Sequence, residues 1–541
     1  MGKLQGVEKR YPVGFDDLLL MEAMREDLAG LSVPVLQHTN APHEYLFISF
    51  LDGTGHDKSK PKLGLPSTVS LLHDQASIAQ GVQGSRIGTS YSSGIGSQSN
   101  PVPRAFDAVF ATTWEVGIKH AYLELAAQAK EWIDADPDAR IRFAGVGYSR
   151  GAVQVAGLAR LIDRYGIVSP IGLSFGHDEY GNIAVMSHAG VLVPPGHVPQ
   201  AALLLDPVAT QMPSNYDARL PPSVVSRVAV MARHEQRRMF PHQAIVTTTS
   251  ELGADGLSLR MIAPGGHSNV GGGNAQAGLE ILTGNLAVDY LNLLRDEPLF
   301  TKRALPPSLE EYARYQKIGM TGAFGFTMDR DDQRDERHEL ANCTIVEPCR
   351  GSEPVDMALA RTLDYRRYQP DPFEQFHLYD MMTRITERDV QAISRIAPAQ
   401  VPHQAMPQSP QHSRQHSPQA SAAPCLPPVD ELTRLLEQDI FRKLAYHDPL
   451  LQLSADRLLH AATVAHSLGY EPGGRWDAMI VGNHLHMAHA GLHRSADRAA
   501  LDLTEPVPAL PLDAGICTRR QAEDLQHVQE RHSREGPVRV M

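Results

Sequence analysis

Residues 141–162 read IRFAGVGYSRGAVQVAGLARLI. The apolar run at 141–146 predicts a buried strand, and the apolar positions that recur after residue 150 predict an amphipathic helix. Between them, Gly147 and Gly151 flank Ser149 in a G-x-S-x-G turn. A turn this sharp strains the backbone at the serine. The neighbouring positions must therefore hold residues with little or no side chain. The stretch therefore predicts a strand, a tight turn and a helix, with the serine hydroxyl at the junction.

This junction has the form of the nucleophile elbow of an α/β-hydrolase. The helix would begin under Ser149, where the partial positive charge of its N-terminus favours developing negative charge. A serine hydroxyl attacks poorly unless a base takes its proton, and in this fold the chain order is serine, acid, histidine. The pentapeptide by itself also fits a glycine–serine turn in some other α/β domain.

Two later predicted strands end at an acid and a base, in that order. Asp206 follows the apolar run 201–205, and His267 follows the run 257–262 inside a glycine-dense loop that could bend the imidazole back towards the serine. His234, which also lies just past a predicted strand, is the second choice for the base. A turn-capping aspartate and an exposed loop histidine are the plain structural alternatives.

The oxyanion hole of such a site needs two backbone N–H groups aimed at one point. One normally belongs to the residue after the nucleophile, here Arg150. The other comes from a loop after an early strand, and the strand predicted at 45–51 runs into a polar turn with two glycines. Gly53 and Thr54 are the candidates for this second donor, with an ordinary tight turn as the alternative.

The composition of the 541-residue chain excludes several classes of protein. A formal net charge of −12, with no long basic stripe, argues against nucleic-acid binding. Four cysteines are too few for a disulfide scaffold, no spacing suggests a zinc site, and neither a metal nor a cofactor is expected. The chain shows no transmembrane run and no signal-peptide core at its N-terminus, so export would need a route that reads no such signal.

Composition also divides the chain into three expected parts. Strands alternate with helices over residues 1–398, with a core at about 45–295, which predicts the α/β class with a mainly parallel sheet between helices. Residues 399–428 are rich in Pro, Gln, Ser and His, which predicts a disordered linker. Residues 429–541 resume globular patterning and predict a small α+β domain with a charged tail.

Six segments in a fixed order carry a resemblance: FLDGTG at 50–55, SGIGS at 93–97, GYSRGA at 147–152, LLDPVAT at 204–210, RHEQRRMFPHQ at 233–243 and GGHSNVGGG at 265–273. Together they resemble the α/β-hydrolase domain of phospholipase effectors secreted by bacterial type VI systems. The resemblance implies Ser149 as nucleophile, His267 as base, Asp206 as its partner, and a phospholipid substrate. Two positions depart from the family: Tyr148 stands for its Phe, and Asn269 for its Asp. If that Asp serves the charge relay or a cation, the role is lost here.

Three C-terminal segments carry a second resemblance: 440–449, 459–491 and 493–511. In pattern they resemble the recognition domain of type IV secreted antibacterial effectors of the Xanthomonas group. The resemblance implies that the C-terminal part is a secretion or docking domain bound by a secretion-system component. A cognate immunity protein is a further expected partner.

The sequence thus predicts a serine hydrolase that cleaves acyl esters of membrane phospholipids, of phospholipase A type, through an acyl-enzyme. The expected protein is made in the cytoplasm, secreted without a signal peptide and delivered to the periplasm or membrane of a target bacterium. One alternative is a general carboxylesterase or neutral lipase of the same fold. Another is a non-enzymatic binding protein on a hydrolase scaffold, against which the intact serine, histidine and glycines weigh.

Overall fold

The computed structural model of the chain describes residues 7–59, 65–96, 114–209, 217–235, 237, 240–246, 253, 255–318, 336–337, 352–396, 436, 440, 455–467, 476–481, 484–489 and 498–502. The chain divides into two compact units, Met1–Ile385 and Thr386–Met541. The linker predicted at 399–428 lies outside the described residues, so it stays a prediction.

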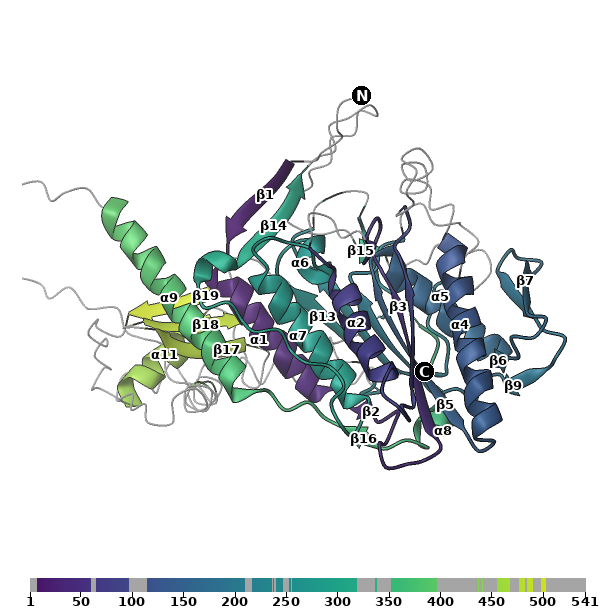
Figure 1. Cartoon of the computed structure of the whole chain (residues 1–541). Coiled ribbons are helices and arrows are strands. Elements are labelled where there is room, and N and C mark those ends of the chain that lie inside the picture. The colour runs from purple at the N-terminus through teal and green to yellow at the C-terminus, as the bar shows by residue number, and fades with distance from the viewer. Residues whose placement is uncertain are drawn as a thin grey trace, which may run out of the picture. The chain divides into compact units, whose positions relative to one another are not determined.

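A six-stranded parallel sheet forms the centre of the first unit (Figure 1). Across the sheet the strands are β4 (Ile87–Ser92), β3 (Glu44–Leu51), β5 (Arg140–Tyr148), β10 (Gln200–Leu205), β11 (Val224–Ala232) and β13 (Ser258–Ala263). Every residue of β10 and β11 is buried, as expected for parallel strands covered on both faces. The predicted α/β class with a mainly parallel sheet is confirmed.

Helices cover the two faces of this sheet (Figure 1). One layer contains α4 (Trp114–Ala135) and α5 (Arg150–Tyr165), and the other contains α1 (Phe15–Gly30), α2 (Thr68–Gln80) and α7 (Gly278–Leu293). The buried residues of α4 recur at three- and four-residue intervals, which gives the helix one apolar stripe against the core. The sequence predicts a helix at about 106–133; the structure has it from residue 114 on, and residues 106–113 lie outside the described part.

The sequence predicts mostly loops over residues 56–104, but these residues contain α2 and the edge strand β4. The sequence of β4, IGTSYS, hides the strand because small polar residues replace the usual apolar ones. Thr89 and Ser90 are buried and make their hydroxyl bonds inside the sheet. Thr89 donates to the carbonyl of Ile48 at 3.0 Å, and the hydroxyls of Ser49 and Ser90 are 2.9 Å apart on neighbouring strands. A β-carbon at Gly88 would lie 2.6 Å from the ring of Phe47, so this position has no room for a side chain.

Shorter elements surround the sheet. The small strand pairs are β1 (Val7–Pro12) with β14 (Ala313–Ile318), β2 (Val33–Pro34) with β16 (Tyr365–Arg366), β6 (Ile167–Val168) with β9 (Val191–Val193), β7 (Ser174–His177) with β8 (Ile183–Met186), and β12 (His242–Gln243) with β15 (Glu336–Arg337). The short helices are α6 (His267–Gly271), η2 (Leu309–Glu311) and α8 (Met357–Ala360). The long helix α9 spans Pro372–Ile396, a range that includes the boundary between the two units. Residues 166–198 are rich in Gly, Pro and His, which predicts an insertion over the sheet, and this segment forms β6 to β9.

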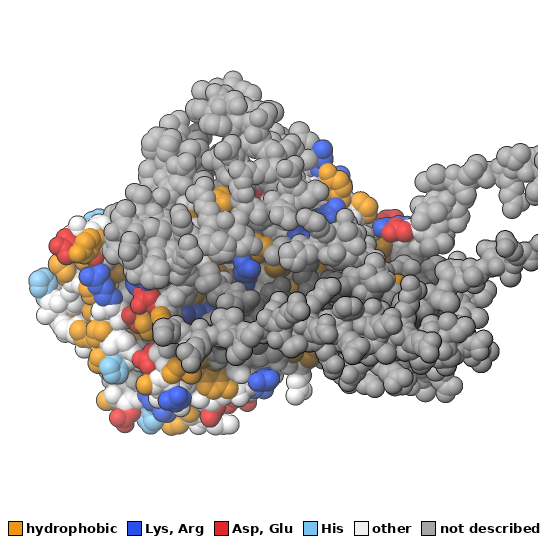
Figure 2. Space-filling view, turned by 180° about the vertical axis from the view of Figure 1, so that it is seen from behind, with side chains coloured by type: hydrophobic (Ala, Val, Ile, Leu, Met, Phe, Trp, Pro, Cys, Tyr) orange, Lys and Arg blue, Asp and Glu red, His pale blue; other side chains and the backbone are white. Residues whose placement is uncertain are grey.

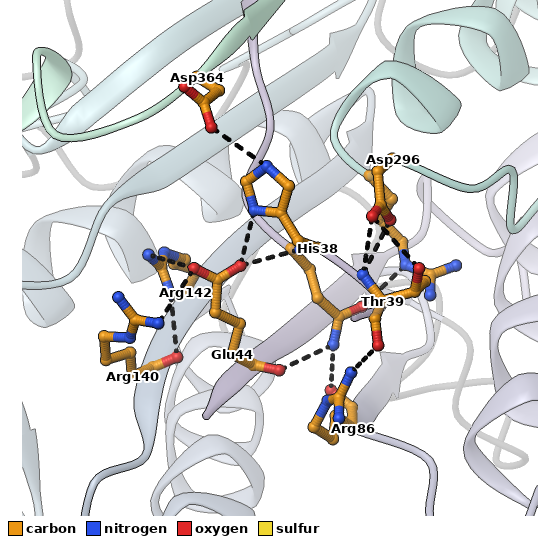
Figure 3. Close-up of polar contacts among 10 residues, drawn as sticks. His38, Thr39, Glu44, Arg86, Arg140, Arg142, Asp296 and Asp364 are labelled. Carbon is orange, nitrogen blue, oxygen red and sulfur yellow. Dashed lines mark hydrogen bonds and ion pairs between the residues drawn. The ribbon is translucent and has the colours of Figure 1, made fainter. Parts of the chain in front are cut away.

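A polar cluster joins loops to the amino ends of β3 and β5 (Figure 3). The carboxylate of Glu44 is 3.3 Å from the guanidinium of Arg142 and accepts a 2.8 Å bond from the backbone N–H of His38. Burial opposes ionisation of Glu44, but the bonds from His38 and the charge of Arg142 bring its pKa below the usual value. In the same cluster Asp296 accepts a 2.9 Å bond from the N–H of Thr39, which fixes the chain after α7 to the chain before β3.

Figure 2 shows one face of the molecule, on which acidic, basic and apolar side chains are interspersed in the described part. The described Lys and Arg side chains on this face do not gather into one patch.

In the second unit the described elements are helix α11 (Ala455–Ser467) and an antiparallel sheet of β17 (Trp476–Val481), β18 (His484–His489) and β19 (Arg498–Asp502). Leu485 and Met487 are two residues apart in β18 and both are buried, so one face of this small sheet packs inward. These elements fit the α+β arrangement expected for residues 429–541. Across both units, none of the described helices has the length and apolar character needed to cross a membrane.

Candidate active site

The predicted nucleophile, acid and base all lie at the carboxyl edge of the central sheet. Ser149 follows β5, Asp206 follows β10, and His267 lies four residues beyond the end of β13. Because these strands are parallel, their carboxyl ends share one edge, where ligands bind in open α/β sheets. The three residues are 2%, 0% and 7% exposed, so the site is largely screened from bulk water.

The turn at Ser149 is strained and enclosed. Its φ is +58° and its ψ is −125°, an unusual conformation for a residue with a side chain. A β-carbon at Gly147 would lie 2.5 Å from the carbonyl oxygen of Gly151, and one at Gly151 would lie 2.2 Å from that of Leu51. The N–H of Ser149 donates to the carbonyl of Leu205 at 2.9 Å, which fixes the turn to the neighbouring strand. The two glycines are thus required by contacts that the pentapeptide motif alone does not reveal.

Asp206 and His267 form a direct hydrogen bond. Nδ1 of His267 is 2.5 Å from Oδ2 of Asp206. The other carboxylate oxygen accepts the N–H of Ala232 at 3.0 Å and lies 3.4 Å from Nδ1 of His242, which is fully buried. Since a carboxylate only accepts, Nδ1 of His267 carries the proton, and Nε2 of the neutral ring is the basic nitrogen.

Besides Asp206, three neighbours fix the position of His267. The hydroxyl of Tyr148 donates to its carbonyl oxygen at 3.1 Å, and the two ring centroids are 4.6 Å apart. The ring of Phe240 meets the imidazole edge-on at 5.1 Å. Glu235 accepts the N–H of His267 at 3.2 Å and is itself held by Arg237. Because Tyr148 directly precedes the serine, the ring contact places the imidazole beside the elbow.

Burial is the main influence on the pKa of His267 and brings it below 6.5, while the nearby Asp206 acts in the opposite direction. A histidine in this state is neutral at physiological pH. It therefore has the protonation state that a general base needs.

Asn269, the departure from the family's Asp, has a structural position in the loop that carries the histidine. Its Oδ1 accepts the N–H groups of Gly266 and Tyr315 at 3.1 and 2.8 Å, and its Nδ2 donates to the carbonyl of Ala313 at 2.9 Å. The side chain is fully buried. The amide uses both its donor and its acceptor to join the histidine loop to β14, which a carboxylate could not do.

His234, the second choice for the base, supports the same loop from another side. Its Nδ1 accepts the N–H of Gly265 at 2.8 Å, and its own N–H donates to the carbonyl of Gly265 at 2.9 Å. Burial, helped by the charges of Arg314 and Arg233, lowers the pKa of His234 to about 3. The structure pairs the acid with His267 and gives His234 a supporting position.

The loop after β3, which carries both candidates for the second oxyanion donor, is anchored by Asp52. This carboxylate is 1% exposed and accepts the N–H of Gly53 at 2.7 Å, the hydroxyl of Ser67 at 2.6 Å and the hydroxyl of Tyr91 at 2.8 Å. The N–H of Gly53 is thus bound to a carboxylate. This favours the N–H of Thr54 as the second oxyanion donor. Asp52 was part of the quoted motif, but its anchoring contacts join segments of the chain that no local pattern connects.

The residues predicted for the oxyanion hole are brought together from two separate segments. Nε of Arg150, at the start of α5, donates to Oγ1 of Thr54 at 2.7 Å. A β-carbon at Gly94 would lie 1.7 Å from the carbonyl oxygen of Gly53, so the loop is also pressed against the chain after β4. Arg150, Gly53 and Thr54 therefore lie together, next to the serine.

One group of side chains among the described residues has metal-ligand spacing. His43, Asp136 and Asp138 each place one ligand atom within 4.8 Å of the others. Nδ1 of His43 is 2.9 Å from Oδ1 of Asp136, a contact that a hydrogen bond accounts for. The group precedes β3 and β5 and so lies at the edge of the sheet opposite the elbow.

Comparison with known proteins finds one family model that matches the part of the chain that carries Ser149. The family model described as "T6SS, Phospholipase effector Tle1-like, catalytic domain" matches residues 46–184, a range that contains FLDGTG, SGIGS and GYSRGA. The predicted resemblance to type VI phospholipase effectors is confirmed over that range. The resemblance of the C-terminal segments stays a prediction. No curated protein matches the chain.

Two solved structures are similar at low identity. An uncharacterized protein from Pseudomonas aeruginosa is 16% identical with a TM-score of 0.31, over 55% of this chain and 51% of that one. The chain thus spans about half the length of that protein. An iodinated complex of acetyl xylan esterase is 10% identical with a TM-score of 0.20, over 46% of this chain and 96% of that one.

Proposed function

We propose that this chain is a serine hydrolase that cleaves the acyl esters of membrane phospholipids, in the manner of a phospholipase A. The observation that carries the proposal is the 2.5 Å bond between Asp206 and His267 at the sheet edge where Ser149 sits in a strained elbow. The match of residues 46–184 to a phospholipase effector model supports the choice of substrate.

In the first half of the reaction, Ser149 attacks the ester carbonyl while Nε2 of His267 takes the hydroxyl proton. Asp206 holds the ring through Nδ1 and stabilises the imidazolium that forms. The negative oxygen of the tetrahedral intermediate is bound by the backbone N–H groups of Arg150 and Thr54. The intermediate collapses to an acyl-serine, and the imidazolium gives its proton to the departing lysophospholipid alkoxide.

In the second half, water attacks the acyl-serine with His267 again as base. His267 passes the proton that it takes from water to the serine oxygen and is then neutral again. The products are a free fatty acid and the restored serine.

We further propose that the protein is an antibacterial effector that acts on the membrane of a target cell. The type VI name of the matched family supports secretion into another cell. The C-terminal domain would bind a secretion-system component, and a cognate immunity protein would protect the producing cell. If so, cells that carry a deletion of residues 429–541 should lose contact-dependent killing. Killing at full strength would contradict an export role for that segment.

The test of the enzymatic proposal uses the full chain and vesicles of phosphatidylethanolamine and phosphatidylglycerol. Mass spectrometry should detect matched amounts of fatty acid and lysophospholipid with the wild type and neither with Ser149→Ala, whose circular dichroism should match the wild type. Hydrolysis of a short-chain ester without any attack on vesicles would favour a general carboxylesterase. A wild type that cleaves no ester and reacts with no fluorophosphonate would favour a binding protein.

A further inference from the structure

The two halves of the oxyanion hole come from segments about one hundred residues apart in the chain, so something must set their separation. Arg150 begins α5, and Thr54 lies in the loop after β3. Their side chains meet directly, with Nε of Arg150 donating to Oγ1 of Thr54 at 2.7 Å. The Arg150 side chain belongs to a residue only 6% exposed, so water competes little for this bond.

The backbone around Thr54 is held on both sides. The N–H of Gly53 is bound to the Asp52 carboxylate at 2.7 Å, and the N–H of Gly55 donates to the carbonyl of Ile95 at 2.8 Å. The Gly55 bond fixes the loop to the chain after β4, and Asp52 in turn accepts the hydroxyl of Tyr91 in β4 at 2.8 Å. Both partners are separate from the elbow. The bond from Arg150 is a side-chain connection that links Thr54 itself to the elbow.

The elbow makes a second, purely steric contact with this loop. A β-carbon at Gly151 would lie 2.2 Å from the carbonyl oxygen of Leu51 and 2.6 Å from that of Asp52. The backbones therefore touch at the base of the loop, which limits how closely the segments approach. The Arg150–Thr54 bond limits how far they separate.

We propose that the side chains of Thr54 and Arg150 form a clamp that sets the distance between the two oxyanion N–H donors. Both side chains are positioning residues in this proposal, which rests on the proposed function. Donors that bind an oxyanion must be held in place before the charge develops, because a displacement of a fraction of an ångström weakens a charge-assisted bond. Loss of the clamp should therefore slow turnover and leave ground-state binding of substrate nearly unchanged.

Thr54 allows a matched pair of substitutions. Thr54→Val keeps the shape and removes the acceptor, whereas Thr54→Ser keeps the hydroxyl and removes only a methyl group. Removing an oxyanion donor outright costs about 100- to 1,000-fold in kcat, so a displaced donor should cost less, about 10-fold for the valine variant. The serine variant should stay within about 3-fold of wild type, and KM should hardly change in either.

Two further readouts separate positioning from stability. A boronic acid that forms a tetrahedral adduct on the serine should bind Thr54→Val about 10-fold more weakly, in parallel with kcat. In an Arg150→Met background, Thr54→Val should cause little additional loss, because methionine has no N–H to donate and the bond is already absent. Melting temperatures of the valine and serine variants would show whether either change disturbs the fold.

The outcomes are distinct. The clamp is supported if Thr54→Val has a lowered kcat and binds the boronate more weakly while Thr54→Ser keeps a kcat near that of the wild type. A wild-type kcat in Thr54→Val, or equal losses of kcat in the valine and serine variants, would overturn the clamp. The proposed function would still stand in that case, provided that the wild type hydrolyses the ester. A wild type inert towards every ester and towards fluorophosphonate would overturn the proposed function, and the clamp with it.

Discussion

Replacing Asn269 by Asp exchanges one atom in the loop that holds His267. Nδ2 of Asn269 donates to the carbonyl of Ala313 at 2.9 Å, and the side chain is fully buried. An ionised Asp at this position keeps the acceptor for Gly266 and Tyr315 but places a second oxygen against the Ala313 carbonyl. The substitution thus removes one hydrogen bond and adds a buried charge without changing the volume.

The structure sets the size and the pH dependence of the effect. Leaving a buried acceptor without its donor costs about 1–3 kcal/mol, and burying a carboxylate adds a cost that the group avoids by taking up a proton. The protonated acid can again donate to Ala313, so the pKa of the new Asp should rise above its unfolded value of about 3.9. Because the pKa is raised in the folded state, the variant's loss of stability is largest at high pH and shrinks as the pH falls through that pKa.

Urea unfolding of the wild type and of Asn269→Asp at pH 8 and pH 5 measures the difference. We expect the variant to be less stable by about 2–4 kcal/mol at pH 8, with a smaller deficit at pH 5. Asn292→Asp is the matched control, since Asn292 also donates to a carbonyl, that of Phe300 at 2.9 Å, but is only partly buried. A deficit that stays the same or grows as pH falls, or one no larger than that of the control, would refute the reasoning.

Three other outcomes follow from the site. Asp206→Asn should lower kcat by about 10⁴-fold with KM little changed, because the amide favours the wrong imidazole tautomer; steady-state kinetics near the wild-type rate would show that another acid orients the histidine. Tyr148→Phe removes the 3.1 Å bond to the carbonyl of His267 and should cost about 0.5–1.5 kcal/mol in chemical unfolding, so an unchanged stability would contradict that contact. The lowered pKa of His267 means that kcat/KM should rise with pH through a midpoint below 6.5 and then level off, and a pH–rate profile with a midpoint above 6.5 would count against His267 as the base.

The elbow could be predicted from sequence because its signals are local. A strand, two glycines and a helix lie within twenty-two consecutive residues of the sequence, 141–162. The pairing of Asp206 with His267 followed from chain order and from the rule that parallel strands end at one edge. Their roles in catalysis remain a prediction that the kinetic experiments address.

The support around the site could not be predicted, because it depends on contacts between distant segments. Asp52 holds its loop through hydroxyls of Ser67 and Tyr91, which are 15 and 39 residues away. Tyr91 lies in β4, the strand whose small polar residues were mistaken for a loop. Their burial depends on hydrogen bonds to neighbouring strands, and no property of the segment itself reveals such partners.

Ser149 and Asp206 are the two non-glycine residues with positive φ in the described part of the chain, at +58° and +46°. Each such conformation costs on the order of 1–3 kcal/mol. Glycine at either position would relieve that cost and would at the same time remove the group that we propose as the nucleophile or as its orienting acid. A library selected for heat resistance alone should therefore accumulate inactive sequences at these two codons, whereas selection for lipid hydrolysis should retain the strained residues and gather its stabilising changes elsewhere.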